Sequence, residues 1–153
     1  MQRIGLISDT HGLLRPEAVD FLRGCDRIIH AGDVCDASVL EGLAAIAPVV
    51  VVRGNNDRGP WADGLATTRT IRIEDVTLHA VHDVAGMAHG TLPADVAIVV
   101  HGHSHRPTVV DRDGVLYVNP GSAGPRRFRL PISVGELWIS GSTIEPRLVT
   151  LIA

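Results

Sequence analysis

The segment RIGLISDTHG, residues 3–12, joins a short apolar run to a polar turn, and the same combination recurs along the first half of the chain. The apolar run predicts a buried strand, because it is short and ends in a turn. The predicted elements of this half are strands at 3–8, 27–31 and 49–53 and helices at 16–23 and 37–46. This alternation of strand and helix is typical of a parallel sheet with helices packed on it.

The second half is richer in predicted hairpins. Two alternating runs, 69–73 and 76–81, are joined by Glu74-Asp75 and predict the first hairpin. The other predicted elements are a buried strand at 96–100 and hairpins that pair 108–111 with 115–118 and 135–139 with 143–151. No repeat, linker or low-complexity segment divides the sequence, so we expect residues 1–153 to form a single domain.

Composition narrows the class of protein. The 153 residues are 45% hydrophobic and 20% charged, with a mean hydropathy of +0.20, which indicates a soluble globular domain. The net charge of −3 argues against a general nucleic-acid binder, with Arg126, Arg127 and Arg129 as a local exception. All 14 basic residues are arginine, so a Walker A phosphate loop and lysine Schiff-base chemistry are excluded.

The cysteines and the N-terminal segment indicate the cellular compartment of the protein. Cys25 and Cys35 supply neither a disulfide framework nor a Cys-rich zinc module, and they indicate a reducing compartment. The first apolar run is too short for a signal peptide, and no stretch is long enough to span a membrane. We therefore expect a cytoplasmic protein that does not bind membranes.

Residues of metal-ligand type follow five of the predicted strands, just past their carboxyl ends. They are Asp9 and His11 after the first strand, Asp33 after the second, Asn55 and Asp57 after the third, His82 after strand 76–81, and His103 and His105 after strand 96–100. Sites in open α/β sheets form in the crevice outside these ends, so the side chains can converge. The mixture of carboxylate, imidazole and amide suits Mn, Fe or Zn better than Mg or Ca. There are more candidate ligands than a single ion can coordinate, which indicates two ions. Pairs of metal ions about 3.5–4 Å apart recur in enzymes that hydrolyse phosphoesters.

The order and spacing of these residues resemble a known family. The ordered motif series of the calcineurin-like metallophosphoesterases is similar to five stretches here: Asp9-x-His11, Gly32-Asp33, Gly54-Asn55-x-Asp57, His82 and Gly102-His103-x-His105. The short chain and the late Asn119-Pro-Gly-Ser122 segment resemble the small prokaryotic phosphodiesterase branch, which is YfcE-like. This resemblance implies an α/β fold that is a four-layer α/β/β/α sandwich, with two mixed sheets flanked by helices.

The resemblance also implies a ligand set and a mechanism. One divalent ion would be held by Asp9, His11, Asp33 and His105, and a second by Asp33, Asn55, His82 and His103, so that Asp33 bridges the two. Mn is the expected metal, with Fe, Zn or Ni as alternatives. A hydroxide between the ions would attack the phosphorus of a small phosphodiester or other phosphoester substrate in line. Asp33, Asn56 and His103 are the residues expected to act in catalysis.

Asn56 departs from the family pattern, because many members carry His at this position. Asparagine donates a hydrogen bond but not a proton at neutral pH, so we expect faster hydrolysis of diesters with good leaving groups than of alkyl monoesters. Two alternatives stay open. One is a phosphomonoesterase or nucleotide phosphatase, and the other is a non-catalytic, metal-binding protein-interaction scaffold, the role that this fold has in the eukaryotic retromer complex.

The remaining histidines receive other interpretations. His79 competes with His82 as a ligand, but it lies within its predicted strand and not at the end. His30 falls inside an apolar strand and is expected in the core, while His101 is expected to be structural or to support a ligand. His89 lies in a loop-like region, either at the surface or near the substrate.

Several charged residues flank the motifs. Asp57 and Asp83 each lie next to a ligand position, and we expect them to orient metal-bound imidazoles. Arg126, Arg127 and Arg129 either grip substrate phosphate, or form a solvated cluster or a subunit contact in a homo-oligomer.

Overall fold

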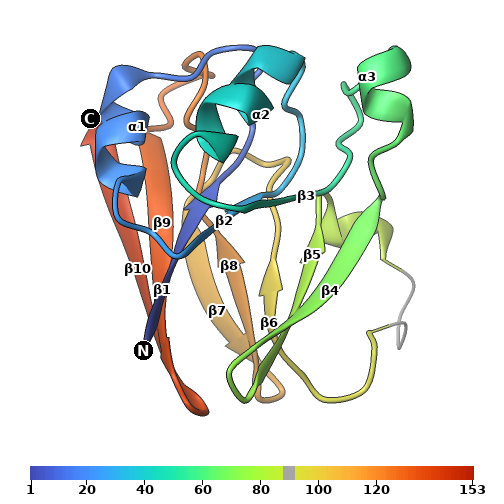
Figure 1. Ribbon diagram of the computed structural model, residues 1–153, viewed down its shortest axis with the longest axis vertical. Helices are drawn as coiled ribbons and strands as arrows, with labels where there is room; N and C mark the ends of the chain where they lie inside the picture. Colours follow the sequence, from blue (N-terminus) through green and yellow to red (C-terminus); the bar gives the residue numbers. More distant parts are fainter. Residues whose placement is uncertain (88–91) are drawn as a thin grey trace.

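Two five-stranded β-sheets face each other in the computed structural model, which describes residues 1–87 and 92–153 (Figure 1). The first sheet has the strand order β10-β9-β1-β2-β3, and the second has the order β4-β5-β6-β8-β7. Each sheet contains both parallel and antiparallel pairs, so both are mixed.

The first sheet joins segments that are far apart in the sequence. Its central strand, β1 (Gln2–Ile7), runs parallel to β2 (Arg27–His30) and antiparallel to β9 (Ile132–Ser140). Beyond β2 lies β3 (Val49–Val51), and beyond β9 lies the edge strand β10 (Thr143–Ile152). The first strand of the chain therefore has one neighbour from the first half and one from the last part of the sequence.

The second sheet is formed by the middle of the chain alone. Its strands are β4 (Thr68–Ile73), β5 (Val76–Val81), β6 (Val96–Val100), β7 (Thr108–Arg112) and β8 (Val115–Asn119). The three inner strands β5, β6 and β8 run parallel, while β4 and β7 pair antiparallel at the edges. The carboxyl ends of the parallel strands of this sheet and of the first point to the same end of the molecule (Figure 1).

Apolar side chains fill the layers between these elements. Leu6 and Ile29 of the first sheet pack against Leu78 and Ile98 of the second, which forms the main core. A second cluster lies where α1 (Pro16–Leu22) and α2 (Ala37–Ala44) cover the first sheet. The outer face of the second sheet carries a small cluster that includes side chains of the turn η1 (Val84–Gly86) and its neighbours. The expected fold, two mixed sheets flanked by helices, is confirmed, and its α-helices are few.

The predicted elements are all present, with differences at their ends. The largest shift is in β9, which begins at Ile132 and not at residue 135. The short helix α3 (Pro60–Asp63) was not expected, because four residues are too few to show helical periodicity, although Gly59-Pro60 is a helix-start signal. No helix within the described residues has the length and apolar character needed to cross a membrane.

A buried ion pair links β1 to β9 below helix α1. Arg3 Nε donates to Glu136 Oε2 at 2.7 Å, and the Arg3 Nη atoms donate to the carbonyl oxygens of Phe21 and Arg23. Trp138 Nε1 donates to the other Glu136 oxygen at 3.0 Å. Burial by itself would raise the pKa of Glu136, but the hydrogen bonds from Arg3 and Trp138 and the nearby arginine charges lower it overall from its ordinary value of 4.5.

This pair predicts a pH-dependent contribution to stability. Because the folded-state pKa of Glu136 lies below the unfolded value, the pair stabilises the fold fully above the unfolded value and loses this effect as the pH falls through the folded pKa. We expect Glu136→Gln to lower the free energy of unfolding in urea more at about pH 7 than at about pH 3. An equal loss at both pH values would contradict this assignment.

Candidate metal centre

The loops that follow five strands bring all seven predicted metal ligands to one end of the molecule. Asp9, His11, Asp33 and Asn55 follow strands of the first sheet, and His82, His103 and His105 follow β5 and β6 of the second. The site therefore lies where the carboxyl ends of the two sheets meet, as expected for sheets of this kind.

The first group of side chains consists of Asp9, His11 and His105. The His11 and His105 Nε2 atoms are 3.4 Å apart, and Asp9 Oδ1 lies 3.5 Å from His105 Nε2 and 3.9 Å from His11 Nε2. Asp9 and His105 are buried, and His11 is partly exposed. Three ligand atoms at this spacing can hold one metal ion between them.

The second group is centred on Asp33 and His82. His82 Nε2 lies 3.4 Å from Asp33 Oδ2 and 3.0 Å from Asn55 Oδ1, and His103 Nδ1 lies 3.2 Å from the same Asn55 oxygen. Asp33 Oδ2 is also 3.7 Å from His11 Nε2 in the first group. Asp33 thus lies near imidazoles of both groups, as the predicted bridging carboxylate would, and so does Asp9, whose Oδ1 is 3.9 Å from His82 Nε2. The ligand roles themselves stay predictions.

Two buried polar atoms of the site have no partner among the described residues, and this favours a bound cation. Asp9 Oδ2 accepts hydrogen bonds from Ser8 Oγ at 2.8 Å and from the His103 backbone N–H at 3.1 Å, while Asp9 Oδ1 and His105 Nδ1 are left without one. A buried carboxylate oxygen without a donor is costly, and a metal ion would supply the missing positive charge. The residues present therefore fit a divalent ion.

Asp33 and His105 are held in forms that bind metal, whereas the raised pKa of Asp9 is a cost that a bound cation would offset. Burial raises the pKa of Asp9, whereas hydrogen bonds from His82 and Asn56 lower that of Asp33 in spite of its burial. Burial, aided by the charge of Arg127, lowers the pKa of His105 to about 4, which keeps the imidazole in its neutral, ligating form near pH 7. His82 Nδ1 donates to the Ala31 carbonyl oxygen at 2.7 Å, so its Nε2 faces the carboxylates.

The backbone of the site is unusual. Of the ten non-glycine residues with positive φ in the described part of the chain, six lie at the site: Asp9, His11, Asp33, Cys35, His103 and His105. Left-handed conformations cost energy in residues with a Cβ and are concentrated at functional sites. Two glycines allow the loops to approach closely. A Cβ on Gly54 would collide with the Asp33 backbone and carboxylate, and one on Gly102 would collide with Ser8 and Asp9.

Asp57 holds the loops together and does not orient an imidazole. Its carboxylate accepts hydrogen bonds from the backbone N–H groups of Asp33 at 3.0 Å, Cys35 at 2.8 Å and Gly54 at 2.8 Å, and the residue is buried. The expectation that Asp57 orients a ligand imidazole is therefore wrong. Asp83 comes closer to that role, because its Oδ2 lies 3.7 Å from His103 Nε2.

Asn56 binds the central carboxylate. Its backbone N–H donates to Asp33 Oδ1 and its side-chain Nδ2 donates to Asp33 Oδ2, both at 2.9 Å. These bonds hold both oxygens of the Asp33 carboxylate, including Oδ2, the oxygen that lies near His11 and His82. The catalytic role expected of Asn56, beside a leaving group, stays a prediction, as do those of Asp33 and His103.

A cavity of about 510 Å³ opens beside the second group. It is lined by Asn55, His82 and His103 and by Arg53, Arg58, Thr67 and Asp83, among others. A phosphoester placed there would meet the candidate ligands and two arginines. The cavity is open enough for a substrate of small-molecule size.

The other histidines lie outside the two groups. His30 is fully buried and contacts Thr10 Oγ1 at 2.9 Å and the Gly32 N–H at 3.1 Å, as expected of a satisfied core histidine. His79 contacts Thr70 Oγ1 at 2.8 Å, so His82 and not His79 reaches the site. His101 packs its ring near that of Tyr117, and His89 lies outside the described residues.

The sequence did not single out three residues that support the site. Ser8 and Ser122 donate to Asp9, through its Oδ2 and its carbonyl oxygen, the latter at 2.9 Å, and Cys35 Sγ lies 3.6 Å from His11 Nδ1. Burial and the neighbouring carboxylates raise the pKa of the Cys35 thiol to about 11, so it stays protonated. The sequence signal for Ser8 is only its position next to the ligand candidate Asp9. The signal for Ser122 is its place at the end of the Asn119-Pro-Gly-Ser122 motif.

Comparison with known proteins identifies the family to which this chain belongs. The sequence model of the calcineurin-like phosphoesterase superfamily domain matches residues 2–141. The chain belongs to this superfamily. A probable metallophosphoesterase of Methanothermobacter thermautotrophicus is 32% identical over 95% of this chain and 91% of its own length. A phosphodiesterase of Methanocaldococcus jannaschii is 27% identical over 78% of this chain and 82% of its own length.

Solved structures of this superfamily share the fold. The phosphoesterase YfcE from E. coli has a TM-score of 0.72 and 24% identity, covering 97% of this chain and 99% of its own. Vps29 of Chaetomium thermophilum has a TM-score of 0.78 and 18% identity, covering 99% of both chains. The resemblance to the calcineurin-like metallophosphoesterases is thus confirmed, and the chain shares its fold with YfcE.

Proposed function

We propose that this metallophosphoesterase is a phosphodiesterase that works with two divalent metal ions, Mn first among them. The observation that carries the proposal is the convergence of two carboxylates, four imidazoles and one amide beside an open cavity, with Asp9 Oδ1 buried and unpartnered within the described residues. A metal-binding scaffold of the same fold would use the ligands but would need no open cavity beside them, so the cavity is what favours an enzyme.

We assign the candidate ligands to two ions. Asp9, His11 and His105 would hold one, Asn55, His82 and His103 the other, and Asp33 would contact both. When bound, the ions supply a Lewis acid for the phosphate oxygens and lower the pKa of the attacking water. Asn56 and Asp57 keep Asp33 and its loop in place through the hydrogen bonds described above.

The substrate proposed is a small phosphodiester in the cytoplasm. Arg58 lines the cavity beside Asn55 and supplies positive charge for its phosphate, whereas the guanidinium group of Arg53, which also lines it, is engaged by the Asp57 carbonyl oxygen and by Asp63. The absence of a general acid at position 56 favours esters whose leaving group needs no protonation. The net charge of −3 still argues against general binding of nucleic acid, and a homo-oligomer is compatible with the exposed arginines.

The metal dependence is tested with protein stripped by a chelator. We expect added Mn to raise the hydrolysis of an aryl phosphodiester by more than about 100-fold, because a metal Lewis acid contributes several kcal/mol to the transition state. An alkyl phosphomonoester, tested alongside, is expected to turn over more slowly. Calorimetric titration of the stripped protein with Mn should show two sites.

Two outcomes would contradict the proposal. Mn binding without hydrolysis of either ester would favour the scaffold, and faster turnover of the alkyl monoester would favour a phosphomonoesterase. Mg serves as the control metal, since the imidazole-rich ligand set is expected to bind it weakly.

A further inference from the structure

An arginine-rich loop, residues 124–131, stands next to the metal centre and has no part in it. We call it the arginine loop. At its tip Phe128 is 87% exposed and adopts a left-handed conformation with φ of 55°. Arg127 and Arg129 flank this ring in the sequence, and both are exposed. A single exposed apolar side chain is ordinary on a protein surface, so the ring matters here only together with the arginines on either side of it.

The loop is fastened at both ends. Arg126 donates to the carbonyl oxygens of Leu130 at 3.0 Å and Ala153 at 2.8 Å, and Arg15 donates to that of Gly124 at 3.2 Å. Of the alternatives for Arg126, a grip on substrate phosphate is disfavoured, because its guanidinium group is engaged in holding the loop. These hydrogen bonds fix the ends of the loop and so the position of Phe128 at its tip.

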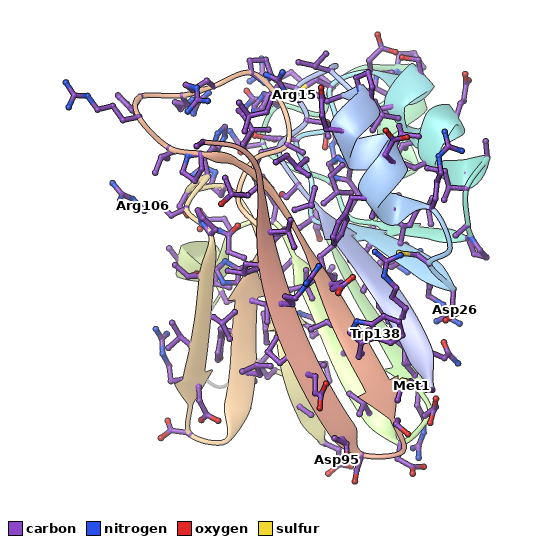
Figure 2. All side chains as sticks on the ribbon, turned by 90° about the vertical axis from the view of Figure 1, so that its left-hand side faces the viewer. Met1, Arg15, Asp26, Asp95, Arg106 and Trp138 are labelled. Atoms are coloured by element: carbon purple, nitrogen blue, oxygen red, sulfur yellow. The ribbon has the colours of Figure 1, made fainter. Side chains whose placement is uncertain are left out.

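The base of the loop touches the metal-ligand turn directly. Ala123 N–H donates to the Ser8 carbonyl oxygen at 3.1 Å, and Ser122 Oγ donates to that of Asp9 at 2.9 Å. On the other side, Arg106 immediately follows the candidate ligand His105 in the sequence. Arg106, Phe128, Arg129 and Leu130 line a cavity of about 640 Å³. Figure 2 shows Arg106 and Arg15 at the same end of the molecule, opposite Asp95.

The arginines in and beside this cavity have uncompensated charges: Arg106 and Arg129 line it, and Arg127 lies next to Phe128 in the loop. Within the described residues, the guanidinium groups of Arg106, Arg127 and Arg129 form no ion pair or hydrogen bond, unlike Arg3 and Arg126. Three free arginines beside a metal site attract a second anionic group of the substrate. The exposed ring between two of them can stack on a planar base, an interaction shared by proteins that bind nucleotides.

We propose that the arginine loop binds one arm of a nucleotide-type phosphodiester, with a second phosphate on Arg106, Arg127 and Arg129 and a base on Phe128. This inference rests on the proposed phosphodiesterase function and names its substrate class. The dinucleotide-sized substrate has its scissile diester at the metal centre and its outer nucleotide in the loop cavity.

A binding experiment tests this independently of turnover. Chelator-treated protein is titrated with a 5′-phosphorylated diadenosine at low salt. We expect Phe128→Ala to weaken binding by about 5- to 100-fold, the range for loss of one base stack, and the double variant Arg127→Gln/Arg129→Gln to weaken it by about tenfold or more. The control is Arg72→Gln, which removes an exposed arginine at the Ile73 end of β4. This variant should bind the dinucleotide as tightly as the unaltered protein does.

The outcomes separate this inference from the proposed function. Unchanged affinity in the double variant overturns it. So does a Phe128→Ala protein that keeps its affinity but changes from dimer to monomer in sedimentation, because the ring is then a subunit contact. A longer single strand that binds much more tightly than the dinucleotide overturns the dinucleotide-sized site. Dinucleotide binding that is lost in the variants, without any metal-dependent hydrolysis, supports the loop assignment and contradicts only the phosphodiesterase.

Discussion

Replacing Asp33 by Asn is expected to lower the kcat/KM of Mn-dependent phosphodiester hydrolysis by well over about 100-fold. Loss of a residue that only supports a ligand costs about 10- to 100-fold, and Asp33 lies within 3.4–3.7 Å of imidazoles from both ligand groups. Asparagine keeps the size and one oxygen but removes the negative charge on which two cations would depend. The measurement is steady-state kinetics over a range of Mn concentrations.

The matched control for this variant is Asp113→Asn. Asp113 is exposed in the hairpin turn between β7 and β8 and has a φ of 54°, which asparagine also adopts readily. It carries the same change of charge without touching the site. An Asp33→Asn protein that retains the kcat/KM of the Asp113→Asn control would refute the bridging role, and circular dichroism would establish that both are folded.

Asp57→Ala is expected to cause a large loss of stability. Two buried backbone N–H groups and a partly buried one would lose their acceptor, and each unsatisfied buried group costs about 1–3 kcal/mol, so we expect a loss of roughly 3–5 kcal/mol in the free energy of unfolding. The measurement is urea unfolding of metal-free protein. Mn binding should weaken as well, because the loops that carry Asp33 and Asn55 lose their common anchor.

Two comparisons sharpen the Asp57 experiment. Asp26 also accepts a backbone N–H, that of Arg3 at 2.8 Å, but in an exposed position, so Asp26→Ala should cost only about 1 kcal/mol. Asp57→Asn keeps one acceptor oxygen, so its loss in the free energy of unfolding should lie between those of Asp57→Ala and Asp26→Ala. Equal losses for Asp57→Ala and Asp26→Ala would show that the three amides find other partners.

The strands and the candidate ligands could be predicted because their signals are local. Residues 4–7 and 49–52 are short apolar runs that predict buried strands, and the candidate ligands follow each run within a few residues. The pairing of β1 with β9 could not be predicted, because nothing near Gln2–Ile7 indicates which late strand it meets. Likewise α3 is too short for its pattern to be recognised.

The supporting contacts of the site depend on distances that the sequence does not contain. Asp57 looks like a neighbour of a ligand, and only the fold shows that its carboxylate faces three backbone amides. Asn56 is expected from its position to act in catalysis, and only the fold shows that both its donors face Asp33. The three arginines 126, 127 and 129 look equivalent in sequence, and only the carbonyl partners of Arg126 separate it from the others.

The position of β1 has a consequence for how the chain folds. The second sheet comes entirely from residues 68–119 and can assemble as soon as that segment exists. The first sheet cannot close in the same way, because β1 stays an open edge until β9 arrives from residues 132–140. The loop that carries Asp9 and His11 follows β1 directly. During synthesis, therefore, the earliest ligands to be made are among the last to be fixed, and contacts of such long sequence separation are expected to make folding slow.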